Sequence, residues 1–261
     1  MELLKTAIVA SLKAGEAIMK IYSTDFNVEI KSDDSPLTLA DKHANDIINT
    51  YIKPLGIPII SEENKQIDYQ IRKDWTRCWI VDPVDGTKEF IKRNGEFTVN
   101  IAFVENGVPL MGVIYVPVTK TLYYANNNKA YKVTLDSHDT PIDEVLEKSN
   151  LIKVKSNDSM VRIVGSRSHL NEETKNLISE IEEKEEVEIV SKGSSLKFCL
   201  VAEGKADIYP RYAPTMEWDT AAGQAICMAA GATVLALPNK TPLLYNKENL
   251  LNPWFLVSNR N

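Results

Sequence analysis

Residues 79–90 decide the fold, and they read Trp-Ile-Val-Asp-Pro-Val-Asp-Gly-Thr-Lys-Glu-Phe. An apolar run typical of a strand ends at Asp82, and a second carboxylate, Asp85, follows three residues later. Gly86 supplies an unrestricted backbone position, and Thr87 opens a predicted short helix whose free N–H groups suit a phosphate. Because hard divalent cations prefer oxygen ligands, the stretch predicts a metal and phosphate site. Taken alone, the same residues also fit an ordinary acidic turn.

Outward from this stretch, the first half of the chain is predicted to hold two helices and a mostly antiparallel sheet. Apolar residues at helical spacing predict helices over residues 1–22 and 39–53. Asn106-Gly107, a strong hairpin signal, joins two of the predicted strands. The strands are predicted at 27–31, 57–60, 79–82, 98–104, 110–116, 122–124 and 129–133.

The second half is predicted to alternate strands with helices, which indicates an α/β arrangement. Clear periodicity is lost from residue 135 to residue 155, and we therefore predict an N-terminal half at 1–140 and a C-terminal half at 141–261. The expected strands lie at 161–165, 186–190, 207–209, 233–237 and 255–258. The expected helices lie at 171–184, 194–203 and 219–230, the last ended by Gly231.

Composition excludes several classes of protein. The chain has 261 residues and a net charge of −6, which argues against binding to a nucleic acid polymer. Its three cysteines form no paired motif, as is typical of reduced thiols in the cytoplasm. Charged residues interrupt the apolar face of the first helix, so neither a signal peptide nor an integral membrane segment is expected. That helix is amphipathic, which leaves open a peripheral position at the inner face of the membrane.

Four separated segments, at 35–41, 59–63, 79–90 and 217–223, resemble the lithium-sensitive, magnesium-dependent phosphatases of the inositol monophosphatase superfamily. Their order and approximate spacing also match. Within the superfamily, Lys88-Glu89-Phe90 and the segments 193–199 and 206–211 resemble the CysQ-type 3'(2'),5'-bisphosphate nucleotidases. The resemblance implies a layered αβαβα sandwich, with an antiparallel-sheet N-terminal half packed on an α/β C-terminal half.

The resemblance also implies a magnesium centre with two or three Mg²⁺ ions. Glu62, Asp82, Asp85 and the Val84 carbonyl would hold the first ion. Asp82, Asp85 and Asp219 would hold the second. Because Asp219 comes from the distant second half, the site is expected at the junction of the halves, where the first half carries most of the metal ligands.

Asp41, Glu62 and Thr87 are the catalytic residues that the resemblance implies. Thr87 and Asp41 would activate a water that attacks phosphorus in line, with no covalent phosphoenzyme. A third, weaker ion would touch Asp41. Taken alone, Asp41 would better fit an exposed residue early in a helix, and its match to the family motif in Thr38-Leu39-Ala40-Asp41 reverses that preference.

Substrate contacts are expected in both halves. Lys197 and Arg211 suit a second phosphate, although both also fit ordinary surface charges. His169 could pack on a base, or it could be a capping or surface residue. The predicted substrate-binding residues are Gly86, Thr87, Ser166, Arg167, His169, Ser194, Ser195, Lys197, Arg211 and Asp219.

These features predict hydrolysis of the 3'-phosphate of adenosine 3',5'-bisphosphate to AMP and phosphate, with 3'-phosphoadenylyl sulfate as a second substrate, in sulfur metabolism. Lys88-Glu89-Phe90 argues against the alternative of an inositol monophosphatase. A nonenzymatic phosphometabolite-binding protein with the same fold is a further alternative. The complete set Asp41, Glu62, Asp82, Asp85, Thr87 and Asp219 weighs against it, because binding alone needs no water-activating pair. The chain is expected to be a monomer or a homodimer.

Overall fold

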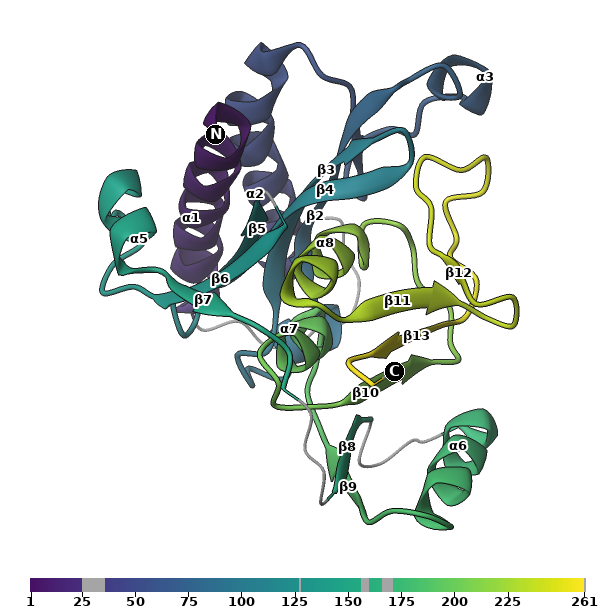
Figure 1. Cartoon of the computed structure of the whole chain (residues 1–261). Coiled ribbons are helices and arrows are strands. Elements are labelled where there is room, and N and C mark those ends of the chain that lie inside the picture. The colour runs from purple at the N-terminus through teal and green to yellow at the C-terminus, as the bar shows by residue number, and fades with distance from the viewer. Residues whose placement is uncertain (25–35, 127, 156–159, 166–170, 261) are drawn as a thin grey trace.

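The computed structural model describes residues 1–24, 36–126, 128–155, 160–165 and 171–260 (Figure 1). The strand predicted at 27–31 therefore lies outside the described residues. The helices are α1 (Glu2–Tyr22), α2 (Pro36–Ile52), α3 (Tyr69–Arg72), α4 (Thr87–Ile91), α5 (Ile142–Lys148), α6 (Glu172–Glu182), α7 (Leu196–Ala202) and α8 (Ala221–Ala230), with a 3₁₀ helix η1 (Lys53–Leu55). The strands are β1 (Ile59–Ser61), β2 (Arg77–Asp85), β3 (Thr98–Glu105), β4 (Val108–Val116), β5 (Thr121–Asn126), β6 (Lys129–Thr134), β7 (Asn150–Ile152), β8 (Val161–Val164), β9 (Val187–Val190), β10 (Ile208–Arg211), β11 (Thr233–Ala236), β12 (Thr241–Pro242) and β13 (Phe255–Ser258).

The described strands form two sheets. The first has seven strands in the order β1-β2-β3-β4-β5-β6-β7, antiparallel except for the parallel pair β1–β2. The second has six strands in the order β12-β11-β13-β10-β8-β9. Its β8, β9 and β10 run parallel, whereas β11, β12 and β13 pair antiparallel. The second half is thus a mixed sheet.

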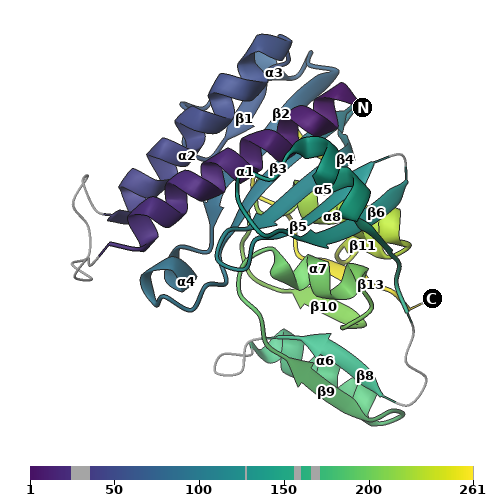
Figure 2. The same cartoon turned by 90° about the vertical axis from the view of Figure 1, so that its left-hand side faces the viewer.

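The elements stack in five layers (Figures 1 and 2). Helices α1 and α2 cover the outer face of the first sheet, α7 and α8 lie between the sheets, and α6 packs outside the second sheet. Separate apolar clusters fill the spaces between these layers. This arrangement is the predicted αβαβα sandwich. No helix in the described part of the chain is long and apolar enough to cross a bilayer.

Helix α8 sits unusually close to the first sheet. A Cβ atom added to Gly112 of β4 would lie 2.4 Å from the carbonyl oxygen of Ala222 in α8. Only glycine fits such a backbone approach. Because α8 follows directly after Asp219, this contact brings the residues at its N-terminus against the strands that carry Asp82 and Asp85.

Short elements account for the differences from the sequence expectations. Residues 141–152, predicted to open the second half, form α5 and β7, and β7 pairs with β6 of the first sheet. Helix α5 has seven residues and buries only Val145, so it gives almost no periodic signal. The chain passes to the second sheet between residues 152 and 161. A division into two domains at 140/141 remains a proposal.

Candidate functional site

Asp82 and Asp85 lie on strand β2, which runs through Asp85 rather than ending at Asp82 as predicted. Asp82 pairs with Asn100 of β3, and Asp85 pairs with Thr98. The chain thus advances three residues along β2 for two residues along β3. Such a bulge bends the strand and tolerates Pro83, which has no N–H donor. Residues three apart in a regular strand would face opposite sides of the sheet. The bulge lets both carboxylates approach one point.

Asp219 reaches that point from the second half, in the turn before α8. One carboxylate oxygen each from Asp82, Asp85 and Asp219 lie within 4.8 Å of one another. The Met216 N–H donates to Asp219 Oδ2 at 2.8 Å. Thr220, and not Asp219, is the N-cap residue of α8. The carboxylate of Asp219 is thus held by the turn that precedes it.

The chemistry of these three side chains fits a hard divalent cation. No ion pair in the described residues involves any of them. Burial, followed by the charges of Asp85 and Glu62, raises the pKa of Asp82 well above its usual value. Burial and then Asp85 raise the pKa of Asp219 to about 7. Converging carboxylates with no positive partner repel one another unless a cation binds between them.

Glu62 follows strand β1 and lies beside the aspartates. Its N–H donates to the Val81 carbonyl of β2 at 3.2 Å. Burial and then neighbouring carboxylates raise the pKa of Glu62, whereas a hydrogen bond with Asp82 lowers it. Glu62 is outside the group within 4.8 Å found among the described residues. Val84, the other predicted ligand of the first ion, is buried, and its N–H donates to Asp82 Oδ1 at 3.0 Å.

Asp41 and Thr87 approach the site from two helices of the first half. Asp41 is half-buried on α2, and Thr87 is exposed as the first residue of α4. Burial, followed by the charges of Glu63 and Glu62, raises the pKa of Asp41 to about 8. Asp41 therefore lies close to the glutamates that flank the cluster. No hydrogen bond joins Asp41 to Thr87 in the described structure, and their pairing stays a prediction.

Ser194 and Ser195, which were predicted to contact substrate, lie against Asp85. The Ser194 hydroxyl and the Ser195 N–H donate to Asp85 Oδ2 at 2.8 and 2.6 Å. The Ser195 hydroxyl donates to Asn100 Oδ1 at 2.8 Å, and the Thr98 hydroxyl lies 2.7 Å from each serine hydroxyl. A turn of the second half therefore orients a carboxylate of the first. The sequence analysis missed Thr98 and Asn100, although polar residues at alternate positions of an apolar strand were a usable signal.

A cavity of about 260 Å³ opens beside Asp85 and Asp219. Gly86 lies in its wall with φ of 106°, a left-handed conformation that favours glycine. A Cβ atom there would also come within 3.2 Å of the Phe97 Cα atom. The backbone at Gly86 can therefore face the cavity without a side chain in the way. Gly86 thus lies in the cavity wall, Thr87 is not among its lining residues, and the predicted phosphate contact at residues 86–87 stays a prediction.

Lys197 and Arg211 line the same cavity as Asp85 and Asp219. Their positive charges therefore lie beside the acidic cluster. Arg211 Nη2 donates to the Pro214 carbonyl at 3.1 Å, but its buried Nε has no hydrogen-bond partner in the described structure. Lys197 Nζ donates to the Ser194 carbonyl at 3.0 Å and lies 5.8 Å from the ring centroid of Tyr209. A buried donor without an acceptor is costly, so Arg211 is suited to an anionic ligand.

A larger cavity of about 750 Å³ adjoins the first. Five residues line both cavities and form the border between two compartments: Lys88, Glu89, Lys197, Tyr209 and Arg211. Gly165 and Tyr212 lie in the wall of the larger one. The predicted contacts Ser166, Arg167 and His169 lie outside the described residues.

The chain matches the model of the inositol monophosphatase family over residues 1–257. It is 45% identical over 249 residues to the 3'(2'),5'-bisphosphate nucleotidase CysQ of Salmonella typhimurium, covering 94% of this chain and 95% of that protein. It is 44% identical over 250 residues to the CysQ of Escherichia coli K12, with the same coverage of both chains. The crystal structure of CysQ from Bacteroides thetaiotaomicron is similar at 51% identity and a TM-score of 0.90, covering 98% of this chain and 97% of that one.

These matches confirm the predicted family resemblance and its CysQ-type branch. They extend over nearly the whole chain, and the similar structure shares the layered fold described above. The family match also agrees with a metal-dependent centre built from the acidic cluster. The chain belongs to the inositol monophosphatase family.

Proposed function

We propose that this chain is a magnesium-dependent phosphatase that removes the 3'-phosphate of adenosine 3',5'-bisphosphate, giving AMP and phosphate. The observation that carries the proposal is the border between the two cavities. An acidic cluster that forms no ion pair in the described residues adjoins Arg211, whose buried Nε has no hydrogen-bond partner there, and a much larger cavity begins on the other side of Arg211. A substrate with one phosphate at the cluster, another at Arg211 and a nucleoside beyond would use all three features.

The relatives support the same assignment. The proteins that are 44–45% identical over most of this chain are named 3'(2'),5'-bisphosphate nucleotidases. An inositol phosphate is smaller and would leave the larger cavity empty. By the same chemistry, 3'-phosphoadenylyl sulfate would be a second substrate, because its sulfated arm extends the same nucleotide. That substrate would place the chain in sulfur metabolism.

The residues of the cluster would hold the metal. Asp82, Asp85 and Asp219, with Glu62 and the Val84 carbonyl, would bind two or three Mg²⁺ ions through oxygen atoms. Bound divalent ions lower the pKa of water and neutralise the charge of a transferring phosphoryl group.

The other residues would orient substrate and move a proton. Asp41, whose pKa is raised to about 8, would accept a proton on its carboxylate as water is activated, and the Thr87 hydroxyl would take part in that step. The backbone at Gly86 would contact the scissile phosphate, and Lys197 and Arg211 would bind the second phosphate. Ser194 and Ser195 would keep the Asp85 carboxylate aimed at the ions through the contacts described above.

Phosphate release from a panel of substrates tests this function. With Mg²⁺ present, we expect kcat/KM for adenosine 3',5'-bisphosphate to exceed that for inositol 1-phosphate by about a hundredfold, because one charge-assisted contact contributes about 1.5–3 kcal/mol. Chromatography should identify 5'-AMP as the product. Equal or better turnover of inositol 1-phosphate would favour an inositol monophosphatase. Tight nucleotide binding without phosphate release would favour a nonenzymatic binder.

A further inference from the structure

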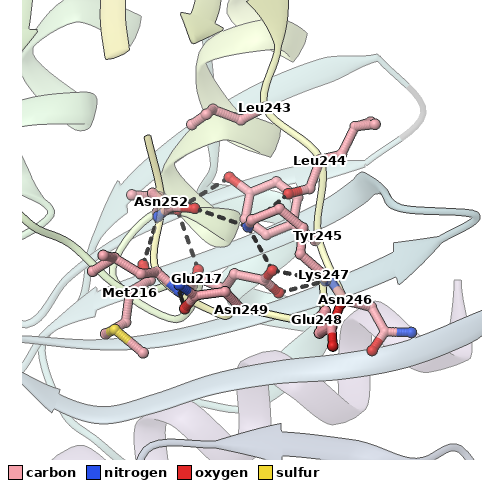
Figure 3. Close-up of polar contacts among 12 residues, drawn as sticks. Met216, Glu217, Leu243, Leu244, Tyr245, Asn246, Lys247, Glu248, Asn249 and Asn252 are labelled. Carbon is pink, nitrogen blue, oxygen red and sulfur yellow. Dashed lines mark hydrogen bonds and ion pairs between the residues drawn. The ribbon is translucent and has the colours of Figure 1, made fainter. Parts of the chain in front are cut away.

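A loop of the second half, residues 243–252, packs around the turn that carries Asp219 (Figure 3), and it is called the wrapping loop below. The Glu217 N–H donates to the Leu250 carbonyl at 3.0 Å, and the Asn252 N–H donates to the Thr215 carbonyl at 2.8 Å. The two segments that meet here, 215–217 and 250–252, are not regular strands. Side-chain contacts therefore help to fix how they align. The wrapping loop is therefore placed to set the position of the metal ligand.

Glu217 is the first anchor of the wrapping loop, and its carboxylate points away from the metal cluster. It is fully buried and accepts hydrogen bonds from the Asn246 N–H at 2.7 Å and the Lys247 N–H at 3.0 Å. Lys247 Nζ donates to the same carboxylate at 2.6 Å (Figure 3). In the described structure the Glu217 carboxylate accepts hydrogen bonds only from the loop, and Glu217 precedes Asp219 by two residues.

Asn252 is the second anchor. Its Nδ2 donates to the Met216 carbonyl at 2.8 Å and to the Thr220 hydroxyl at 3.0 Å, so it holds both sides of the turn. Lys247 Nζ donates to Asn252 Oδ1 at 3.3 Å as well as to Glu217 (Figure 3). Met216 is held on both sides, because its carbonyl accepts from Asn252 Nδ2 and its N–H, in the preceding peptide group, donates to Asp219 Oδ2. One ammonium group therefore joins both anchors of the turn that holds Asp219.

Arg72 ties the wrapping loop to the first half of the molecule. Arg72 is buried, and its Nη1 donates to Asn246 Oδ1 at 2.8 Å and to the Lys247 carbonyl at 3.1 Å. In return, Asn246 Nδ2 donates to the Arg72 carbonyl at 2.7 Å. These hydrogen bonds hold the loop against the half that carries Asp82 and Asp85. A continuous set of polar contacts fixes where Asp219 lies relative to those two carboxylates.

We propose that Lys247 is a positioning residue for the metal centre, acting through Glu217 and Asn252 on the turn that presents Asp219. The inference rests on the proposed metal site, but it does not depend on which phosphate ester is hydrolysed. Its role is geometric, because Lys247 has no contact with Asp82, Asp85 or Asp219 in the described structure. Outer residues that orient metal ligands typically contribute ten- to hundredfold to metal affinity.

The test compares Lys247→Met with Lys132→Met. Lys132 is a matched control, because its Nζ also lies 2.6 Å from a buried carboxylate, that of Glu203. The two lysine side chains are similarly exposed, 29% for Lys247 and 26% for Lys132. Neither Lys132 nor Glu203 contacts a member of the acidic cluster. Both variants lose a half-buried ion pair, so both should lower the melting temperature of the metal-free chain.

Calorimetric titration with Mg²⁺ and the Mg²⁺-induced rise in melting temperature separate the two variants. We expect the Kd of Lys247→Met for Mg²⁺ to rise about ten- to hundredfold. Lys132→Met should stay within about twofold of the unaltered chain, and Lys247→Arg should recover part of the loss because it keeps the charge. Equal Mg²⁺ affinity in both methionine variants would overturn the inference.

Asn252→Ala provides a second variant that keeps the ion pair of Lys247 with Glu217. It should weaken Mg²⁺ binding in the same direction by a smaller factor, and unchanged affinity would count against the inference even if Lys247→Met failed to fold. These readouts involve no nucleotide, so a failed nucleotide assignment would not be mistaken for failed positioning. An unaltered chain that bound no Mg²⁺ would overturn both the metal site and this inference.

Discussion

The molecule buries acidic side chains in two contrasting ways. In the first, Asp207 accepts three hydrogen bonds from Arg162, at 2.8, 2.9 and 2.9 Å, and Glu217 lies 2.6 Å from Lys247 Nζ. In the second, Asp82, Asp85 and Asp219 converge with no ion pair in the described residues. Within the described part of the chain, the first group has a cation at ion-pair distance, and the second group has none.

The pKa directions of Asp207 and Asp82 express the same difference, whereas in Glu217 burial outweighs Lys247 and the pKa is raised. Burial alone would raise the pKa of Asp207, but the hydrogen bonds from Arg162 bring it below the usual value. Burial and the neighbouring carboxylates raise the pKa of Asp82 well above it. Both side chains are almost completely buried. Acids with structural roles therefore have cationic partners, whereas the cluster at the junction of the halves is left for a cation from outside.

The largest expected effect is that of Asp85→Asn, which removes charge from the unpaired group. We expect kcat/KM to fall by more than about a thousandfold, because a direct ligand should matter more than the outer residues that contribute ten- to hundredfold. The melting temperature of the metal-free chain should not fall, since repulsion among the carboxylates is relieved. Activity near normal at saturating Mg²⁺ would remove Asp85 from the centre.

Asp207→Asn removes charge from the paired group and should have the opposite profile. It leaves the partly buried Arg162 without a charged partner, which should cost about 2–3 kcal/mol of unfolding free energy. Mg²⁺ affinity should be unchanged, as measured by calorimetry at a temperature where the variant is folded. A loss of Mg²⁺ affinity similar to that of Asp85→Asn would erase the distinction between the groups.

Arg211→Ala extends the comparison to cations. The guanidinium of Arg162 is occupied by Asp207, whereas Arg211 Nε has no partner in the described structure. We expect kcat/KM for adenosine 3',5'-bisphosphate to fall about ten- to hundredfold, as for a lost charge-assisted contact. A nucleotide with only the 3'-phosphate should be affected less, and Arg211→Lys should recover part of the loss. Equal losses on both substrates would assign Arg211 to the fold or to the scissile phosphate.

A smaller effect should appear in the dependence of stability on pH. The pKa values of Asp41 and Asp219 are raised to about 8 and about 7, so the folded metal-free chain keeps protons that the unfolded chain releases. Its stability should therefore fall as pH rises from about 4 to about 8. Mg²⁺ binds the charged carboxylates and opposes this loss. The difference between the melting temperatures measured with and without Mg²⁺ should increase over that range. A constant difference would contradict the predicted linkage between carboxylate ionisation and Mg²⁺ binding.

The paired and unpaired acids also differ in how far the sequence predicts them. An acidic site at Asp82 and Asp85 is predicted from a local motif at the end of an apolar strand, and the long elements around it are predicted from periodicity. The ion pair between Glu217 and Lys247 joins residues thirty positions apart in an irregular loop, where no periodic pattern exists. Strand β7 was missed for a related reason, because three residues carry too little pattern to show which sheet they join.

Ser194 and Ser195 show a second limit of sequence reasoning. Their position before a helix was compatible with binding an anion, and the anion that they contact in the structure is the carboxylate of Asp85. Local chemistry predicted the type of partner, but tertiary packing decided which one. The same holds for Asn100, whose polar side chain in a buried strand is explained only when the second half is in place.

Calorimetric titration of the metal-free chain with Mg²⁺, in buffers of different ionisation enthalpy at about pH 7, tests the central claim most directly. Burial and neighbouring carboxylates raise the pKa values of Asp82 and Asp219, so Mg²⁺ binding should release protons. Asp85→Asn should bind Mg²⁺ at least about tenfold more weakly, and Asp207→Asn should bind it as the unaltered chain does. Binding without proton release and with the same affinity in both variants would contradict the claim that the unpaired aspartates form a cation site.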